Sequence, residues 1–166
     1  MTVSFDQLPN DTRVWVYTAN RLLTEQEVLF VQTQLNQFTA EWSSHGSPLN
    51  AASYVFDQSI IIVAVENGWN DASGCSIDKS VAVLKHIEHE LKVSFFDRMV
   101  ILYKKDENAP ILFLGLHELK TGLKDGSYSN EGFIVNTQQS VLEVVKISPW
   151  ESIKNSWLAT PTISLI

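Results

Sequence analysis

The strongest constraint on the fold is an unbroken apolar run of Ile, Val and one Ala near the middle of the chain, Ile60–Val65. A run of this length and β-branched composition favours a strand over a helix. Because no polar residue interrupts it, we expect a central strand that is covered on at least one face. The run is too short to cross a membrane, so we expect no membrane span. It forms a hairpin with residues 53–56 through Asp57-Gln58.

A strand and a helix are predicted before this hairpin. Residues 12–18 are rich in β-branched and aromatic side chains, which is typical of a strand. Thr24 and Glu27 have the spacing of a capping box, which predicts the start of a helix. The apolar positions of that helix step by three and four residues and predict one buried face: Val28, Val31, Leu35, Phe38 and Trp42.

A second helix and further strands are predicted after the hairpin. The helix covers about residues 74–92, and strands follow at residues 98–103 and 111–114. The order strand, helix, strand, strand, helix, strand predicts an α+β protein with a ferredoxin-like βαββαβ core over about residues 12–105. The buried face of the second helix is predicted from its apolar spacing: Ile77, Val81, Leu84 and Leu91.

The remainder of the chain predicts a C-terminal β/α extension of the same single domain, residues 1–166. A short helix is expected at residues 117–124 and a strand at 132–135. Ser148 and Pro149 have the residue types of a helix start. The apolar tail, residues 160–166, is expected to pair with a sheet edge or a second subunit.

Composition and charge exclude several classes of function. The formal net charge of −7 opposes nucleic-acid binding, which needs a surplus of Lys and Arg. The N-terminal residues lack the pattern of a signal peptide, and the single cysteine cannot form an internal disulfide. We therefore expect a cytoplasmic protein.

The predicted topology brings two distant loops together. In a ferredoxin-like arrangement the first helix ends, and the second begins, at the same end of the sheet. The loop of residues 42–46 is therefore expected beside the loop of residues 74–78.

The sharpest catalytic hypothesis is a thiol nucleophile at Cys75. A helix N-terminus favours a thiolate, and His45 on the facing loop could act as base, with Asp78 orienting it. The alternative is that Cys75 is a small, half-buried filler and Asp78 a capping carboxylate. The alternative is favoured, because free cysteines are among the most buried residues.

A milder hypothesis is a small anionic ligand at the same place. Gly74 and Ser76 would offer backbone donors at the helix start, and Arg13 or Lys105 would supply positive charge. Trp42 and Gly46 would line the pocket from the facing loop. An ordinary capped helix end is the simpler alternative, because most helix N-termini bind only water and their own cap.

Nucleotide and metal sites are not expected. Residues 73–80 resemble a phosphate-binding P-loop, but Ser73 and Asp78 stand where its two glycines are required. His86 and His89 lie opposite the apolar stripe of their helix, which predicts a solvated face without a metal. No cofactor is predicted.

Several short segments carry a resemblance that covers about the first two-thirds of the chain. They are residues 5–9, Arg13-Val14-Trp15, Trp42, His45-Gly46, residues 74–78 and Phe96-Asp97-Arg98. With these the chain resembles a family of small uncharacterised bacterial proteins that are often labelled "ABC transporter ATPase". The resemblance implies a bacterial protein and no particular activity. The missing P-loop glycines predict that this chain is not a genuine ABC ATPase.

The sequence leaves two candidate functions. The first is a binding or adaptor module with an anion or small-ligand pocket between the two loops, which docks a protein partner or a second copy of itself. The second is a small thiol-dependent enzyme using Cys75, His45 and Asp78. The enzyme requires an exposed Cys75 with His45 in reach, whereas the module predicts an exposed apolar patch.

Overall fold

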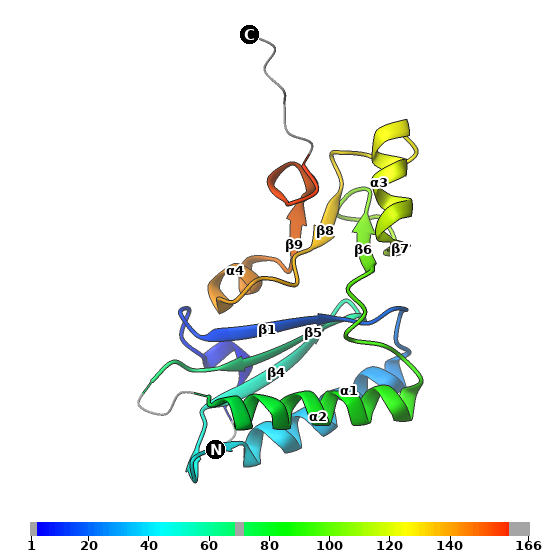
Figure 1. Ribbon diagram of the computed structural model, residues 1–166. Coiled ribbons are helices and arrows are strands. Elements are labelled where there is room, and N and C mark those ends of the chain that lie inside the picture. The colour runs from blue at the N-terminus through cyan, green and yellow to red at the C-terminus, as the bar shows by residue number, and fades with distance from the viewer. Residues whose placement is uncertain (1–2, 69–71, 160–166) are drawn as a thin grey trace. The chain divides into compact units, whose positions relative to one another are not determined.

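The computed structural model describes residues 3–68 and 72–159 and divides the chain into two compact units (Figure 1). The described residues of the first unit lie within Met1–Asp97 and Thr137–Pro149, and those of the second within Arg98–Asn136 and Trp150–Ile166. Helices and antiparallel sheets occur in both, which confirms the mixed α and β class. That residues 1–166 form a single domain stays a prediction.

The first unit is built on a three-stranded antiparallel sheet. Its strands are β1 (Arg13–Thr18), β4 (Ala51–Phe56) and β5 (Ile60–Val65), in the order β1-β5-β4. Every residue of β5 is buried, which confirms the predicted central strand. The hairpin turn between β4 and β5 holds Asp57 and Gln58 at φ 48° and 52°, the left-handed values that a type I′ turn requires.

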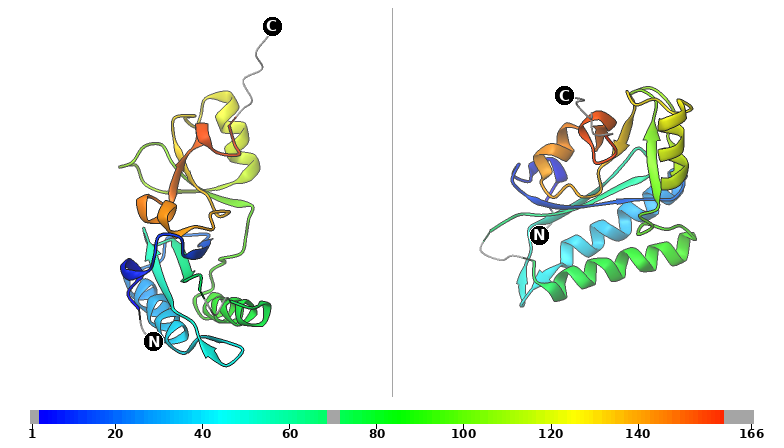
Figure 2. Two further views of the ribbon diagram at one scale, coloured as in Figure 1. Left: turned by 90° about the vertical axis from the view of Figure 1, so that its left-hand side faces the viewer. Right: turned by 45° about the horizontal axis from the view of Figure 1, so that its top comes forward.

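Two helices, α1 (Glu25–Glu41) and α2 (Gly74–Leu91), cover one face of this sheet (Figure 1 and Figure 2). The predicted capping box of α1 is confirmed: Thr24 Oγ1 accepts a hydrogen bond from the Glu27 amide, and Glu27 Oε2 accepts one from the Thr24 amide. The core of the unit includes fully buried side chains from both helices and the central strand, among them Val31, Leu35, Ile61, Leu84 and Ile87.

The buried face of α2 differs from the predicted apolar stripe. Ile77, Val81 and Leu91 are only half-buried, and Leu84 alone of that stripe is fully buried. Two serines lie inside because their hydroxyl groups bond to the helix backbone. Ser80 Oγ, for example, donates to the Ile77 carbonyl oxygen at 2.7 Å. The residues that form the buried face are Ser76, Ser80, Leu84 and Ile87.

The outer edge of β1 is joined by a segment that returns from far along the chain. The Val14 amide donates to the Ser140 carbonyl oxygen at 3.0 Å, and the Leu142 amide donates to that of Thr12 at 2.9 Å. The segment continues into α4 (Leu142–Ile147), a helix that the sequence patterns did not predict. In a ferredoxin-like sheet the fourth strand would lie at this edge.

The second unit contains the strand that was expected there, and the ferredoxin-like prediction is wrong in this respect. Residues 98–103 contribute β6 (Val100–Lys104), which pairs with β7 (Leu112–Gly115) and β8 (Phe133–Val135). With β9 (Trp150–Ser152) they form a separate antiparallel sheet in the order β7-β6-β8-β9. The helix α3 (Leu116–Asp125) packs on it and ends at Gly126 in the left-handed conformation, close to the predicted end.

The helix predicted to start at Ser148-Pro149 is also wrong. Trp150 pairs with Val135 across β8 and β9, and this cross-strand pairing overrides the local helix-start pattern. Only a short 3₁₀ turn, Ile153–Asn155, follows β9. The predicted pairing of residues 160–166 lies outside the described part of the chain.

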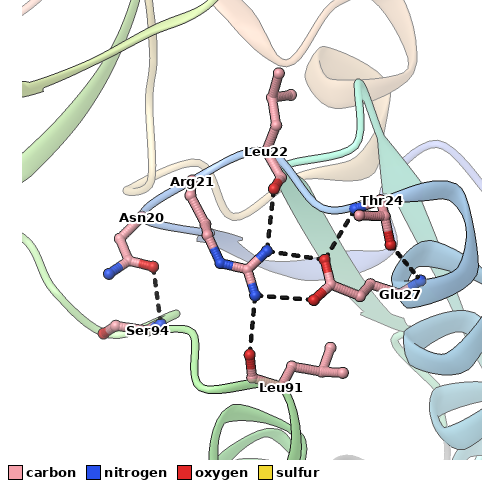
Figure 3. Close-up of polar contacts among 7 residues, drawn as sticks. All are labelled: Asn20, Arg21, Leu22, Thr24, Glu27, Leu91 and Ser94. Carbon is pink, nitrogen blue, oxygen red and sulfur yellow. Dashed lines mark hydrogen bonds and ion pairs between the residues drawn. The ribbon is translucent and has the colours of Figure 1, made fainter.

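A polar cluster in the first unit joins the start of α1 to the end of α2 (Figure 3). The Arg21 guanidinium donates to both carboxylate oxygens of Glu27, at 2.8 and 2.9 Å, and to the Leu91 carbonyl oxygen at 2.9 Å. The Arg21 hydrogen bond and the Thr24 amide lower the pKa of Glu27 from 4.5 to about 2. One charged pair therefore holds the start of α1 and the end of α2 together.

Candidate functional site

Two hydrogen bonds join the loop after α1 to the start of α2. The indole Nε1 of Trp42 donates to the Ser76 carbonyl oxygen at 2.9 Å, and the Ser73 amide donates to Ser44 Oγ at 3.3 Å. The predicted meeting of the two loops is therefore confirmed. We call residues 42–46 and 73–78 together the two-loop corner.

The first loop of the corner is a small hairpin. Its strands, β2 (Ser43–Ser44) and β3 (Ser47–Pro48), are antiparallel, with Ser44 opposite Ser47. The turn residues His45 and Gly46 have φ 51° and 82°, so both occupy the left-handed region as in a type I′ turn. Both residues are exposed. The left-handed conformation of this turn is therefore by itself a structural reason for the presence of His45-Gly46.

The second loop is the capped N-terminus of α2. Ser73 is the N-cap, and its side-chain oxygen accepts a hydrogen bond from the Ser76 amide at 3.3 Å. The Ile77 amide donates to the Ser73 carbonyl oxygen. In the part of the chain that the structure describes, the amides of Gly74 and Cys75 have no acceptor. Two exposed residues at the start of an 18-residue helix thus each carry an N–H group without an acceptor among the described residues.

A row of aromatic rings leads from the corner to a positive charge. The rings of Trp42 and Trp15 have centroids 6.3 Å apart, and the Arg13 guanidinium carbon lies 4.6 Å from the Trp15 ring centroid. Arg13 is exposed, whereas Trp42 is buried. The cation is therefore held by cation–π contact at the same end of the sheet as the corner.

The predicted ligand-binding residues divide into two groups. Trp42 and Ser76 are buried, and their polar groups bond within the fold: the indole N–H to Ser76, and the Ser76 hydroxyl to the Ser73 carbonyl oxygen at 2.8 Å. Gly46, Gly74 and Arg13 are exposed. A Cβ atom on Gly74 would meet nothing within 4 Å, so its backbone is open to solvent.

The predicted catalytic residues are all exposed, on the two sides of the corner. Cys75 is a free, exposed thiol at the second position of α2, so it is not a half-buried filler. Asp78 is exposed, and Ser73 rather than Asp78 caps the helix. Among the described residues, no hydrogen bond or ion pair links the side chains of Cys75, His45 and Asp78. Their catalytic roles stay a prediction.

Sequence reasoning missed Ser73 and Ser44, which hold the corner together. Ser73 could have been found, because serine directly before a helix is a preferred N-cap. Ser44 has no such signal, because its role depends on a hydrogen bond across 29 residues of sequence.

Neither a metal cluster nor a membrane helix is present in the described residues. Residues 3–68 and 72–159 contain no group of three or more His, Cys, Asp or Glu side chains arranged to hold a metal ion. His86 and His89 are both exposed on α2. Within the same residues, no helix has the length and apolar character needed to cross a membrane.

Comparison with known proteins gives no relative. No protein-family model matches the chain, and neither a curated protein nor a solved structure matches it significantly. The resemblance seen in the sequence therefore stays a prediction, and any function has to be argued from the two-loop corner itself.

Proposed function

We propose that this protein is a non-catalytic binding module that takes a small anion, a phosphate or a carboxylate group, at the two-loop corner. The observation that supports this is a pair of amides, those of the exposed residues Gly74 and Cys75, which have no acceptor among the described residues and lie in a corner fixed by the Trp42–Ser76 hydrogen bond. The ligand would be bound by backbone donors rather than by Trp42 or Ser76, whose polar groups are already paired.

Two features favour an anion at the start of α2, against the exposed carboxylate of Asp78 in the same corner. Aligned peptide dipoles place a partial positive charge at a helix N-terminus, and α2 is 18 residues long. Arg13 adds a full positive charge at the same end of the sheet. This local charge contrasts with the net charge of −7 of the whole chain, so an anion would be directed to the corner.

We propose a cytoplasmic location for the module, since its free thiol needs no oxidising compartment.

The proposal is tested by following backbone amide NMR signals while inorganic phosphate, and separately acetate, is added at constant ionic strength. We expect saturable shifts at Gly74 and Cys75, with smaller shifts at Gly46, and a matched chloride titration serves as the control. Shifts that are equal in chloride, or that are spread evenly over the chain, would rule out an anion site at the corner.

The second candidate is a thiol-dependent enzyme, and the exposure of Cys75 at the start of α2 favours it. An enzyme of this kind needs a thiolate and a base in reach. The test is the rate of alkylation of Cys75 by iodoacetamide at neutral pH, compared between the unchanged protein and a His45→Asn variant. A rate that is unaffected by the loss of His45 would remove His45 as the base.

A further inference from the structure

Two buried side-chain oxygen atoms at one end of the first unit's sheet have no hydrogen-bond partner among the described residues. They are Thr12 Oγ1, just before β1, and Asn50 Oδ1, just before β4. Thr12 has 0% of its surface exposed, so solvent does not reach its hydroxyl group. A buried polar atom without a partner costs free energy, and a bound water molecule or ion is a common explanation for one in a native fold.

The first of these residues, Thr12, lies opposite Glu66. The antiparallel pairing of β1 with β5 runs to the last residue of β5, so the next residue along the chain, Glu66, comes opposite Thr12. The contact directly beyond continues this register, because Asn67 Nδ2 donates a hydrogen bond to the Asp11 carbonyl oxygen. Thr12 and Glu66 are therefore cross-strand neighbours.

The second residue, Asn50, lies beside Glu66 on its other side. The Glu66 amide donates to the Asn50 carbonyl oxygen at 2.9 Å, and Asn50 Nδ2 donates to Glu66 Oε2. This second bond fixes the orientation of the carboxamide and leaves Oδ1 as an acceptor. Cross-strand neighbours point to the same face of a sheet with Cβ atoms about 5 Å apart. A hydroxyl, a carboxylate and an amide oxygen therefore form one row across the sheet end.

The chemistry of this row suits a cation. Glu66 forms no ion pair with a basic side chain in the described part of the chain, so its negative charge is not neutralised there. Hydroxyl, carboxamide and carboxylate oxygens are the ligands that hard cations take in proteins. A water molecule is neutral and can donate only two hydrogen bonds, whereas a cation can contact all three kinds of oxygen at once.

We propose that Thr12, Asn50 and Glu66 bind a calcium ion, with water molecules completing its coordination. Calcium accepts about six to eight oxygen ligands in flexible geometry, whereas magnesium demands a near-ideal octahedron, so ligands from three separate strand ends suit calcium better. Because the site holds a single carboxylate, its dissociation constant should be on the order of 10⁻⁴ to 10⁻³ M. Thr12 alternates along the strand with Arg13 and Trp15, so this site and the proposed anion site use opposite faces of the sheet.

The experiment follows the backbone amide NMR signals of the full chain while calcium chloride is added, with sodium chloride holding the ionic strength constant. We expect saturable shifts centred on Thr12, Asn50 and Glu66. Thr12→Val replaces the hydroxyl group by a methyl group of similar size and should weaken calcium binding at least about tenfold. Magnesium chloride should also bind at least about tenfold more weakly than calcium chloride.

Matched variants separate the ligand atoms from general effects. Thr12→Ser keeps a hydroxyl group and should still bind calcium. Thr18→Val removes a hydroxyl group from another buried threonine, at the far end of β1, and should leave calcium binding unchanged. Glu66→Gln removes the charge but keeps an acceptor for Asn50, and should also weaken calcium binding at least about tenfold. Glu41→Gln, at the exposed end of α1, is its control.

Melting temperatures without calcium provide an independent readout. Thr12→Val should melt no lower than the unchanged protein, because it removes a buried hydroxyl group that has no partner. Circular dichroism checks that each variant is folded. A lower melting temperature of Thr12→Val without calcium would show that the hydroxyl group is already paired within the protein. That result, the absence of saturable calcium shifts in the unchanged protein, calcium binding that survives Thr12→Val or Glu66→Gln, or equally tight magnesium binding would each overturn the proposal.

Discussion

The indole Nε1 of Trp42 donates a hydrogen bond to the backbone carbonyl oxygen of Ser76 across 34 residues of sequence, at 2.9 Å. Both residues are buried, so this bond is shielded from water and its loss cannot be compensated by solvent. It fixes the end of α1 to the first turn of α2 and so defines the two-loop corner.

Replacing Trp42 by Phe keeps an aromatic ring but removes the donor. We expect the free energy of unfolding to fall by about 0.5 to 1.5 kcal/mol, because one buried hydrogen bond to the Ser76 carbonyl oxygen is lost while that oxygen keeps its place in the helix. Urea unfolding measures this loss. Trp15→Phe is the control, since Trp15 is only partly buried and packs against the Trp42 ring. Equal losses in the two variants would mean that ring size, and not the hydrogen bond, matters.

The Arg21–Glu27 pair predicts a loss of stability in acid. The folded-state pKa of Glu27 is about 2, below its ordinary value of 4.5, so its contribution is fully present above pH 4.5 and is lost as the pH falls towards 2. The side chains of Arg21 and Glu27 are 40% and 21% exposed, and solvent screening reduces the contribution to about 1 to 2 kcal/mol.

The measurement for this pair is the free energy of unfolding between pH 2 and pH 6, for the unchanged protein and for Arg21→Met. The variant should be less stable at pH 6 and should lose less stability on acidification. An identical pH dependence in both proteins would show that the carboxylate of Glu27 is not held by Arg21.

In the second unit, Gly132 is predicted to be intolerant of any side chain. A Cβ atom there would lie 2.6 Å from the Lys104 carbonyl oxygen, which belongs to the backbone of β6 and cannot move aside cheaply. Gly132→Ala should lower the stability by about 1 to 3 kcal/mol. Gly115→Ala is the matched control, because a Cβ atom at Gly115 meets nothing within 4 Å. Thermal unfolding of the two variants should differ clearly, and equal melting temperatures would contradict the close approach of Gly132 to the backbone of β6.

Substitutions in the turn of the β2-β3 hairpin test whether His45 has a structural role. Asn adopts the left-handed conformation readily, so His45→Asn should leave the stability unchanged. Gly46→Ala should cost about 1 to 2 kcal/mol, because Gly46 has φ 82°. Chemical denaturation checks both, and a marked loss of stability in His45→Asn would show that the imidazole makes a structural contact.

Local patterns predicted much of the first unit. The Ile60–Val65 run, the Thr24–Glu27 capping box and the Asp57-Gln58 turn each depend on residues close in sequence, and each is found in the structure. The meeting of the two loops was also predicted, because it depends only on where α1 ends and α2 begins relative to β1, β4 and β5.

The rest depended on partners that are distant in sequence. β6 has the composition of a strand, but composition does not say which sheet it joins, and it pairs with β7 and β8 instead of β1. The Ser148-Pro149 pattern favours a helix locally, yet the pairing of Trp150 with Val135 makes the following residues a strand. At the corner, the apolar spacing correctly placed Trp42 on a buried face, but the hydrogen bond from its indole to Ser76 could not be seen in the sequence, so both residues were also predicted to contact a ligand.

The central claim, that the unpaired amides at the start of α2 bind an anion, is tested most directly at Gly74. Gly74→Pro removes one N–H group at the first helical position, where proline is tolerated, and the extended conformation of Ser73, with ψ 164°, accepts a following proline. Gly74→Ala keeps the N–H group and adds a methyl group that has space. We predict that isothermal titration with inorganic phosphate shows binding to the unchanged protein and to Gly74→Ala, and at least about tenfold weaker binding to Gly74→Pro. Equal affinity in Gly74→Ala and Gly74→Pro, or no binding to the unchanged protein, would contradict the proposed anion site.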